Sequence, residues 1–391
     1  MPHPTPNTFL TPDTKHPNAH SIITTMSSLT STHRVERLAS QLQEDGIDVY
    51  FANSPISMGY LHGFWEGSHE RFLTLAVRAT GDVRLICPAL SANQALRSGI
   101  AEIQSWEDGS DPMELFANLA ADWNLKSAIL AVDDEMPAQM LLKMQAVLPA
   151  ALFKPGLPSL SKLMRHKDAN EIRLLKEAAS IADRALTAGI EAIKPGVTER
   201  DVERALNNAM ENLGGKPTFC IVAAGPNAAE PHHLSDGTTI KQGEIVLMDF
   251  GCSVDGYQSD ITRTVSCGTA SDEAKKVYST VLASHNAGRS AAQSGATSGQ
   301  VDAASRKVIS DAGYGEYFIH RTGHGLGLRG HEEPYILGGD PTVLQEGDVF
   351  SIEPGIYLPG KFGVRIENIV TIGASGGYSL NEDPATELIE V

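Results

Sequence analysis

The chain has 391 residues and a formal net charge of −17, and 41% of its residues are hydrophobic and 20% charged. This composition is typical of a globular protein that is too long for one core, which favours two domains. Because no apolar run approaches the roughly 20 residues of a membrane span and no Lys and Arg cluster suits phosphate groups, we expect neither a membrane nor a nucleic acid as a partner.

The N-terminal stretch and the cysteines bear on where the protein resides. Residues 1–31 are rich in Pro, Thr and His and lack the apolar centre of a secretory signal, so a disordered extension is expected, with Met26 as an alternative start. The four cysteines, Cys87, Cys220, Cys252 and Cys267, are widely spaced. Their spacing suggests neither a C-x-x-C zinc motif nor a disulfide framework. We interpret the protein as cytoplasmic.

A first domain is predicted over residues 32–160. Short apolar runs alternate there with helical patterns, which predicts an α/β layout. The expected strands cover residues 47–52, 72–77, 84–87 and 128–132, and the expected helices cover residues 91–97, 112–123 and 137–147. The Pro- and Gly-rich residues 153–158 interrupt this pattern and place the domain boundary near residue 160.

A second domain, residues 161–391, is predicted to open with two helices. Asp168 is a suitable N-cap for the first because Glu171 follows three residues later, and Thr198 begins the second. The pattern then predicts strands at residues 219–223, 244–250, 261–265, 349–353 and 364–372 and helices at residues 273–292 and 299–311. This order indicates an α+β domain built mainly from hairpins.

Two acidic residues are expected on one face of the hairpin at residues 245–264. If Cys252 faces Tyr257 across a four-residue loop, Asp249 lies directly opposite Asp260, with Cβ atoms roughly 5 Å apart. A single Asp near a turn is usually only a turn former. Two facing carboxylates repel each other, however, so either one is protonated or both bind shared cations.

A second acidic pair and a histidine extend this set. A five-residue loop at residues 358–362 places Glu353 opposite Glu367, and the apolar strand before Glu353 makes an unpaired carboxylate costly. Between the hairpins, His324 offers a neutral imidazole, and its flanking glycines let the backbone approach a site closely. Four carboxylates and one histidine suit two divalent ions, with Mn, Co, Fe or Zn favoured over a thiol-selected metal.

Six motifs carry a resemblance to a known family. They are MDFG (248–251), SDITRT (259–264), HRTGHGLGL (320–328), HEEP (331–334), IEPGIY (352–357) and GVRIEN (363–368). In order and spacing they resemble the motifs of the pita-bread metallopeptidases, which include prolidase, Xaa-Pro aminopeptidase, methionine aminopeptidase and creatinase. The preceding region, with ERFL at residues 70–73, is similar to the N-terminal domain of the proline-directed branch. The resemblance implies an α+β pita-bread catalytic domain preceded by an α/β creatinase-like domain.

The resemblance also implies a metal centre and a reaction. The family's five metal ligands match Asp249, Asp260, His324, Glu353 and Glu367, and all five are present. Two divalent ions, most simply Mn²⁺ with Co²⁺, Fe²⁺ or Zn²⁺ as alternatives, would support hydrolysis of the peptide bond before proline while Glu353 relays a proton. The complete ligand set favours an enzyme over a binding protein descended from a peptidase.

Further residues receive roles by the same resemblance. His232 precedes Asp249 by seventeen residues, as the family's active-site histidine does, and His331 matches the second one. Both are expected to contact the substrate and stabilise the oxyanion. His233 is interpreted as a bystander. Arg365 is expected either to contact the substrate or to hold the acidic cluster by a salt bridge.

One position departs from the family pattern and leaves the substrate length open. Some prolidases carry an arginine four residues after the second histidine, where this chain has Tyr335. That arginine can hold the free carboxylate of a dipeptide, so its replacement removes one support for a dipeptidase. An Xaa-Pro dipeptidase is still expected, with an Xaa-Pro aminopeptidase on longer peptides as the alternative. A hydrolase of a non-peptide small molecule on the same fold is a further alternative. The family generally forms homodimers, so a homodimer is expected.

Overall fold

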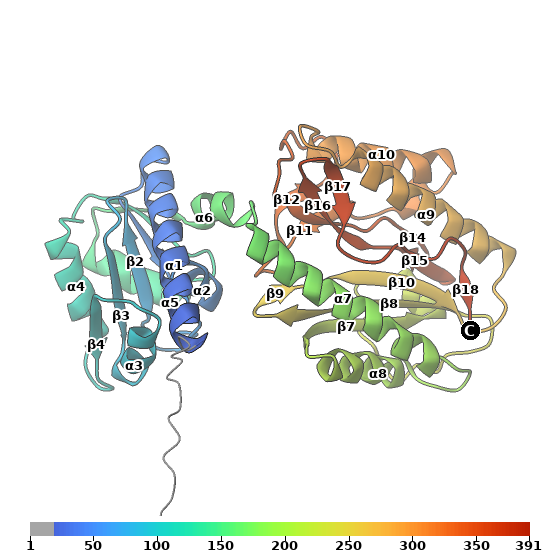
Figure 1. Cartoon of the computed structure of the whole chain (residues 1–391), viewed down its shortest axis with the longest axis horizontal. Helices are drawn as coiled ribbons and strands as arrows, with labels where there is room; N and C mark the ends of the chain where they lie inside the picture. The colour runs from blue at the N-terminus through green and yellow to red at the C-terminus, as the bar shows by residue number, and fades with distance from the viewer. Residues whose placement is uncertain (1–18) are drawn as a thin grey trace, which may run out of the picture. The chain divides into compact units, whose positions relative to one another are not determined.

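The computed structural model describes the backbone of residues 19–391 and the side chains of residues 32–391 (Figure 1). The chain divides into two compact units, Met1–Leu160 and Ser161–Val391. Residues 1–18 of the expected disordered extension lie outside the described residues, whereas residues 19–31 belong to helix α1 (Ala19–Glu44). Among the described residues, no helix has both the length and the apolar character needed to cross a membrane.

The first unit is built around a six-stranded mixed sheet in the order β4-β3-β2-β1-β5-β6. Its strands are β1 (Val49–Ala52), β2 (Thr74–Arg78), β3 (Val83–Pro88), β4 (Ile103–Trp106), β5 (Ile129–Val132) and β6 (Leu152–Pro155). Its further helices are α2 (Pro55–His62), α3 (Ala89–Arg97), α4 (Pro112–Asp122) and α5 (Ala138–Val147), and α6 (Leu157–Met164) follows. The α/β prediction is confirmed. The sequence does not predict the edge strands β4 and β6, because they are partly exposed and lack a continuous apolar pattern.

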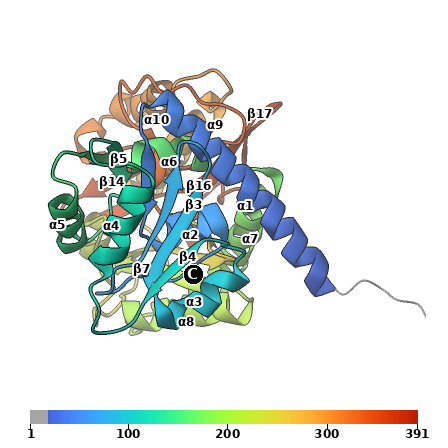
Figure 2. The same cartoon turned by 90° about the vertical axis from the view of Figure 1, so that its left-hand side faces the viewer.

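The core of this unit lies between the sheet and two of its helices. Phe51 and Ile86 from the sheet pack with Phe116 of α4 and Met144 of α5. Figure 2 shows α4 and α5 on one side of the strands and α1 on the other. Helices on both faces explain why β1, β2 and most of β3 are buried apolar runs without alternation.

The second unit begins with two helices whose starts follow from local sequence. Asp168 and Glu171 form a capping box at the start of α7 (Ala169–Ala192). Thr198 and Asp201 form another at the start of α8 (Glu199–Asn212). Each box pairs backbone N–H groups that the first turn of a helix leaves free. The predicted starts at Asp168 and Thr198 are confirmed.

The rest of this unit forms two sheets and a hairpin. Its strands are β7 (Lys216–Ala224), β8 (Ile245–Val254), β9 (Tyr257–Gln258), β10 (Ile261–Ser266), β11 (Gly323–Gly325), β12 (Glu332–Ile336), β13 (Val349–Ile352), β14 (Gly355–Leu358), β15 (Phe362–Arg365), β16 (Asn368–Gly373), β17 (Gly376–Ser379) and β18 (Ile389–Glu390). Its other helices are α9 (Asp272–Ala291), α10 (Ser298–Asp311) and the short 3₁₀ helices η1 (Gly225–Ala229) and η2 (Gly315–Tyr317).

Each sheet of the second unit is covered by a pair of helices. One sheet has the order β18-β10-β8-β7 with β9 beside β8, the other has the order β12-β11-β13-β16-β17, and β14 pairs with β15. Helices α7 and α8 pack on the first sheet, and α9 and α10 lie over the second sheet and the hairpin (Figure 1). The α+β prediction is confirmed, and the inner faces of the two sheets are left to carry polar residues.

The first hairpin differs from its predicted register. Asp249 pairs with Thr262, so the predicted direct opposition of Asp249 and Asp260 is wrong. The connection is a two-residue turn at Asp255 and Gly256, whose φ angles of 47° and 86° are both positive, instead of a four-residue loop. Such turns match the natural twist of paired strands. The observed register differs from the predicted one by two residues, an even number, so Asp249 and Asp260 still lie on the same face of the hairpin.

The second hairpin has its predicted register. The β13–β16 and β14–β15 ladders keep one register, which places Glu353 and Glu367 opposite each other between them. Pairing extends to Leu358 and Phe362, so the loop covers residues 359–361 and is shorter than the predicted five residues. The short loop sets this register, because loop length determines which residues of a hairpin face each other.

Candidate dinuclear metal centre

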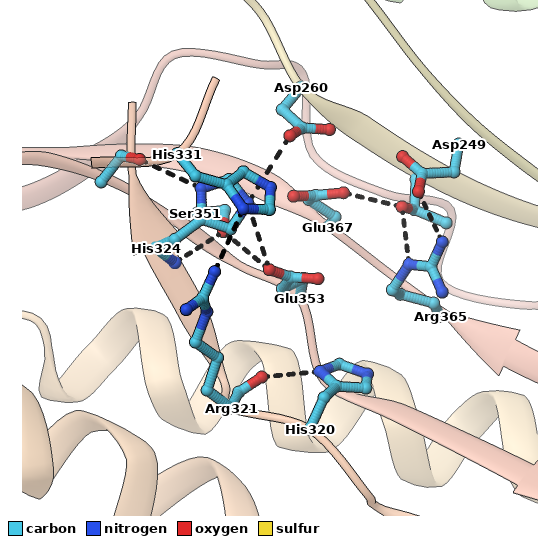
Figure 3. A network of polar contacts seen from close by, with 12 residues as sticks. Asp249, Asp260, His320, Arg321, His324, His331, Ser351, Glu353, Arg365 and Glu367 are labelled. Atoms are coloured by element: carbon cyan, nitrogen blue, oxygen red, sulfur yellow. Dashed lines mark hydrogen bonds and ion pairs between the residues drawn. The ribbon is translucent and has the colours of Figure 1, made fainter. Parts of the chain in front are cut away.

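The five predicted metal ligands converge on one cavity of the second unit. Asp249 lies on β8, Asp260 between β9 and β10, His324 on β11, Glu353 directly after β13, and Glu367 between β15 and β16. All five line a cavity of about 1020 Å³. Figure 3 shows Asp260, Glu353 and Glu367 gathered around His324. Strands of both sheets therefore build the site together.

His324 has one ring nitrogen available to a metal ion. Its Nδ1 lies 3.0 Å from the carbonyl oxygen of Gly325, to which it donates, so Nε2 carries the lone pair. Nε2 lies 3.4 Å from Glu353 Oε1 and 3.7 Å from Asp260 Oδ2. Burial lowers the pKa of His324 to about 3, which keeps the ring neutral. A lone pair and two carboxylates so close together repel unless a cation lies between them.

The glycines beside His324 have a role in packing. A Cβ atom on Gly323 would lie 1.9 Å from the backbone oxygen of Ser351, and one on Gly325 would lie 2.3 Å from that of Glu333. These glycines therefore let β11 lie close to its neighbouring strands. The sequence instead predicted that they let the backbone approach a bound ligand. It fixes the backbone of His324, whose N–H donates to Ser351 Oγ at 3.1 Å.

Asp249 is held on one side and free on the other. Its Oδ2 accepts from Nη2 of Arg365 at 2.6 Å, and the guanidinium also donates to Thr262 Oγ1 and to the hydroxyl of Tyr357. The remaining oxygen, Asp249 Oδ1, is buried and has no hydrogen-bond partner among the described residues. A buried acceptor left unpaired costs about 1–3 kcal/mol. The ion pair supports the salt-bridge role predicted for Arg365.

Asp260, Glu353 and Glu367 have raised pKa values. Burial raises the pKa of Asp260 and Glu367 well above the ordinary range, and repulsion from the neighbouring acids raises both further. Burial also raises the pKa of Glu353 to about 7, although the positive charge of Arg365 opposes the shift. Bound cations would reverse these shifts by stabilising the ionised forms.

Divalent metal ions fit this set of donors. Asp260, His324 and Glu367 each place one ligand atom within 4.8 Å of the others. The unpaired Oδ1 of Asp249 is a further acceptor outside that group. Carboxylate oxygens with one imidazole are the donors that Mn, Fe, Co and Zn bind in two-metal sites. The site therefore has donors for more than one ion.

Both predicted active-site histidines line the same cavity. The ring of His331 lies against that of His324, with 3.8 Å between the centroids. Its Nδ1 accepts from Nη2 of Arg321 at 3.2 Å, so Nε2 carries the ring hydrogen. Burial, reinforced by the charge of Arg321, lowers the pKa of His331. His232 lies in the loop that follows η1.

Four residues in or near the cavity have contacts that the sequence did not predict. His320 Nε2 lies 2.8 Å from the hydroxyl of Tyr357, and His320 Nδ1 donates to the backbone oxygen of Arg321 at 2.6 Å. The guanidinium of Arg321 lies 4.5 Å from the ring centre of Tyr335. His320 and Arg321 open the HRTGHGLGL motif, and that position is the signal that could have found them.

His233, interpreted from the sequence as a bystander, contacts a buried residue of α8. Its Nε2 lies 2.9 Å from Oε2 of Glu199, a residue of α8 with 0% exposure. With Asp236, these two residues form a second group of closely spaced polar ligand atoms. The loop that carries His232 is therefore attached to α8.

Comparison with known proteins identifies the class that this fold and site define. Residues 173–374 match the metallopeptidase family M24 model, and residues 34–165 match the creatinase/prolidase N-terminal domain. The chain belongs to metallopeptidase family M24, in agreement with the family resemblance of its motifs.

Individual relatives extend along nearly the whole chain. An Xaa-Pro dipeptidase of Lactobacillus helveticus is 36% identical and covers 88% of this chain and 95% of its own length. A prolidase structure from Thermococcus sibiricus has a TM-score of 0.87 at 37% identity, and the match covers 92% of this chain and 98% of the prolidase. An X-Pro aminopeptidase structure from Thermotoga maritima has a TM-score of 0.79 at 30% identity, and the match covers 91% of this chain and 99% of the aminopeptidase.

Proposed function

We propose that the protein is an Xaa-Pro dipeptidase that hydrolyses the bond between an N-terminal residue and a C-terminal proline with two divalent metal ions. The convergence of four carboxylates and the free Nε2 of His324 in one cavity, where Asp249 Oδ1 is unpaired, carries this proposal. The substrate class is supported by the relatives, because the prolidase structure is more similar to this chain than the aminopeptidase structure.

The proposed metal ligands are Asp249, Asp260, His324, Glu353 and Glu367. Their oxygen-rich chemistry favours Mn²⁺, with Co²⁺, Fe²⁺ and Zn²⁺ as alternatives. When bound, the ions would supply Lewis-acid activation of the scissile carbonyl and of the attacking water.

The proposed roles of the protein groups follow from their contacts. Glu353 would accept a proton from the attacking water and deliver it to the departing proline nitrogen, and Ser351 orients it through a hydrogen bond of 3.1 Å to Oε1. His331, whose Nε2 carries hydrogen, would donate to the developing oxyanion, and His232 would contact the same part of the substrate. Arg365 would position Asp249, because its guanidinium is 3% exposed and paired with that ligand.

Proline explains why a dedicated cavity is useful. Its nitrogen bears no hydrogen once it is acylated, so proteases that hold their substrates as an extra β-strand lose a contact there. A cavity that recognises the ends of a short peptide does not need that contact.

The direct test uses metal-stripped protein with an Xaa-Pro dipeptide and an Xaa-Pro-Xaa tripeptide, each with and without Mn²⁺. We expect Mn²⁺-dependent cleavage of the dipeptide and slow cleavage of the tripeptide. Glu353→Gln, which keeps the shape but not the charge, should lose at least about 100-fold in kcat. Cleavage of the tripeptide alone would make the protein an aminopeptidase. Metal binding without cleavage of either peptide would favour a non-peptide substrate.

We also propose that the protein is a cytoplasmic homodimer. The dimer is supported by the family resemblance, and the location by Cys87, Cys220, Cys252 and Cys267, which are all free thiols. Sedimentation at several protein concentrations tests the dimer, and fractionation of cells tests the location.

A further inference from the structure

One cation in the wall of the cavity has no role in the proposed function. Arg321 directly precedes Thr322 and β11, is partly buried and lines the cavity. The other arginine of the cavity, Arg365, is already paired with Asp249. Among residues 32–391, by contrast, no carboxylate forms an ion pair with Arg321.

Three contacts orient Arg321 without neutralising its charge. The ring of Tyr335 faces the guanidinium at 4.5 Å, and Nη2 donates to His331 Nδ1 at 3.2 Å. The backbone oxygen of Arg321 accepts from His320 Nδ1 at 2.6 Å, which fixes the start of the side chain. Figure 3 shows the side chain extending to His331, which in turn lies against His324. A guanidinium has five N–H donors, so most remain available to a ligand.

We propose that Arg321 binds the C-terminal carboxylate of the dipeptide and thereby selects dipeptides over longer peptides, an inference that rests on the proposed function. A dipeptide brings a carboxylate into this cavity, and because Arg365 is already paired with Asp249, Arg321 is the arginine of the cavity wall that is available to pair with it. The planar guanidinium suits a carboxylate because it can donate two parallel hydrogen bonds. In a longer peptide a neutral amide occupies this position, and the charge contributes nothing.

The test compares an Xaa-Pro dipeptide with the matching Xaa-Pro amide, whose C-terminus is neutral, on Mn²⁺-loaded enzyme. The wild type is expected to prefer the dipeptide in kcat/KM by about 10- to 100-fold, the usual effect of a charged hydrogen bond. Arg321→Gln should bring that preference close to unity, mainly through a higher KM for the dipeptide. Arg321→Lys keeps the charge and should retain part of the preference.

A binding measurement gives a second readout that does not depend on turnover. By calorimetry, Arg321→Gln should weaken the binding of L-proline, which bears the carboxylate, by about 10-fold or more and that of L-prolinamide far less. Tyr335→Phe keeps the ring that faces Arg321 and should retain the preference for the carboxylate.

The matched control is Arg173→Gln. Arg173 is an exposed arginine of α7 that forms an ion pair with Glu177 at 3.0 Å, and it lies outside the cavity wall. This variant should keep the wild-type preference. Equal losses of Arg321→Gln on the dipeptide and the amide, or a wild type without preference, would overturn the inference while leaving the proposed function intact. A wild type that cleaves neither substrate would overturn both.

Discussion

Glu199 and His233 are joined by a contact of 2.9 Å between Oε2 and Nε2, although they lie 34 positions apart in the chain. Glu199 Oε1 also accepts from the backbone N–H of Ala224 at 2.8 Å and from Asn227 Nδ2 at 3.0 Å, and Oε2 accepts from the N–H of Asp236 at 3.1 Å. One carboxylate of α8 therefore holds both ends of the loop that carries His232.

We expect Glu199→Gln to reduce kcat/KM by about 10-fold or more. The amide nitrogen of Gln cannot accept a hydrogen bond. In either orientation of the side chain, it replaces one of the two carboxylate oxygens, and the contacts of that oxygen with the loop are lost. Each lost hydrogen bond to a charged group costs about 1.5–3 kcal/mol. Kinetics on the dipeptide and thermal unfolding of the same preparation provide the measurement.

Asp201→Asn is the control for Glu199→Gln. Asp201 also lies in the first turn of α8, but it bonds to Thr198 and does not touch the loop. It should lower stability without a comparable loss of activity. An equal loss of activity in both variants would mean that helix stability, and not the position of His232, is what matters.

Glu353→Gln is expected to stabilise the metal-free protein at alkaline pH. The folded-state pKa of Glu353, about 7, lies above its ordinary value of 4.5, so its stabilising contribution is present below pH 4.5 and is lost as the pH rises through 7. A neutral Gln avoids that loss. The Tm of the metal-free variant should exceed that of the metal-free wild type by about 3–10 °C at pH 8.

Two comparisons make the result for Glu353 specific. At pH 4 the difference in Tm should largely vanish, and added Mn²⁺ should raise the Tm of the wild type more than that of the variant. A constant difference across the pH range would show that Glu353 is not a destabilising charge in the metal-free cluster.

His285 is expected to make the protein sensitive to acid. It is fully buried in α9, neither ring nitrogen has a hydrogen-bond partner among the described residues, and burial lowers its pKa to about 3, aided by Arg263 and Arg289. Because the folded pKa is below the ordinary 6.5, its contribution is present above pH 6.5 and is lost as the pH falls toward 3.

His285→Leu removes that titration. Urea unfolding at pH 8, 6 and 5 should show the free energy of unfolding of the wild type falling relative to the variant by up to about 1.4 kcal/mol per pH unit below pH 6.5. Parallel pH profiles for the two proteins would contradict the prediction.

The pair of Lys167 and Glu332 is expected to be costly to break. Lys167 Nζ contacts Glu332 Oε1, with side-chain exposures of only 1% and 6%, and Glu332 Oε2 has no hydrogen-bond partner among the described residues. Lys167→Met would leave a buried charge alone and should lower the free energy of unfolding by about 3–5 kcal/mol. Chemical denaturation measures it.

The double variant with Glu332→Gln should recover much of that loss, because no unpaired charge is left. The exposed pair of Arg173 and Glu177 is the contrast, and Arg173→Met should change stability by less than about 1 kcal/mol. If Lys167→Met behaved like Arg173→Met, the buried pair would contribute little.

The sequence by itself determined the features that depend on near neighbours. Asp168 and Glu171 predicted the start of α7, because a capping box involves only two residues that lie three positions apart. The short loop of the second hairpin predicted that Glu353 lies opposite Glu367, because loop length determines which residues of a hairpin face each other. The motif spacing likewise identified all five residues now proposed as ligands.

Only the tertiary structure decided the relationships between distant segments. Asp249 and Arg365 are 116 positions apart, and nothing in either strand specifies the partner of the other. The turn at Asp255 and Gly256 changed the first hairpin's register, because alternation alone cannot distinguish registers that differ by two residues. Contacts such as that of Arg321 with Tyr335 arise when separately formed strands pack, and the local periodicity of a sequence carries no information about that packing.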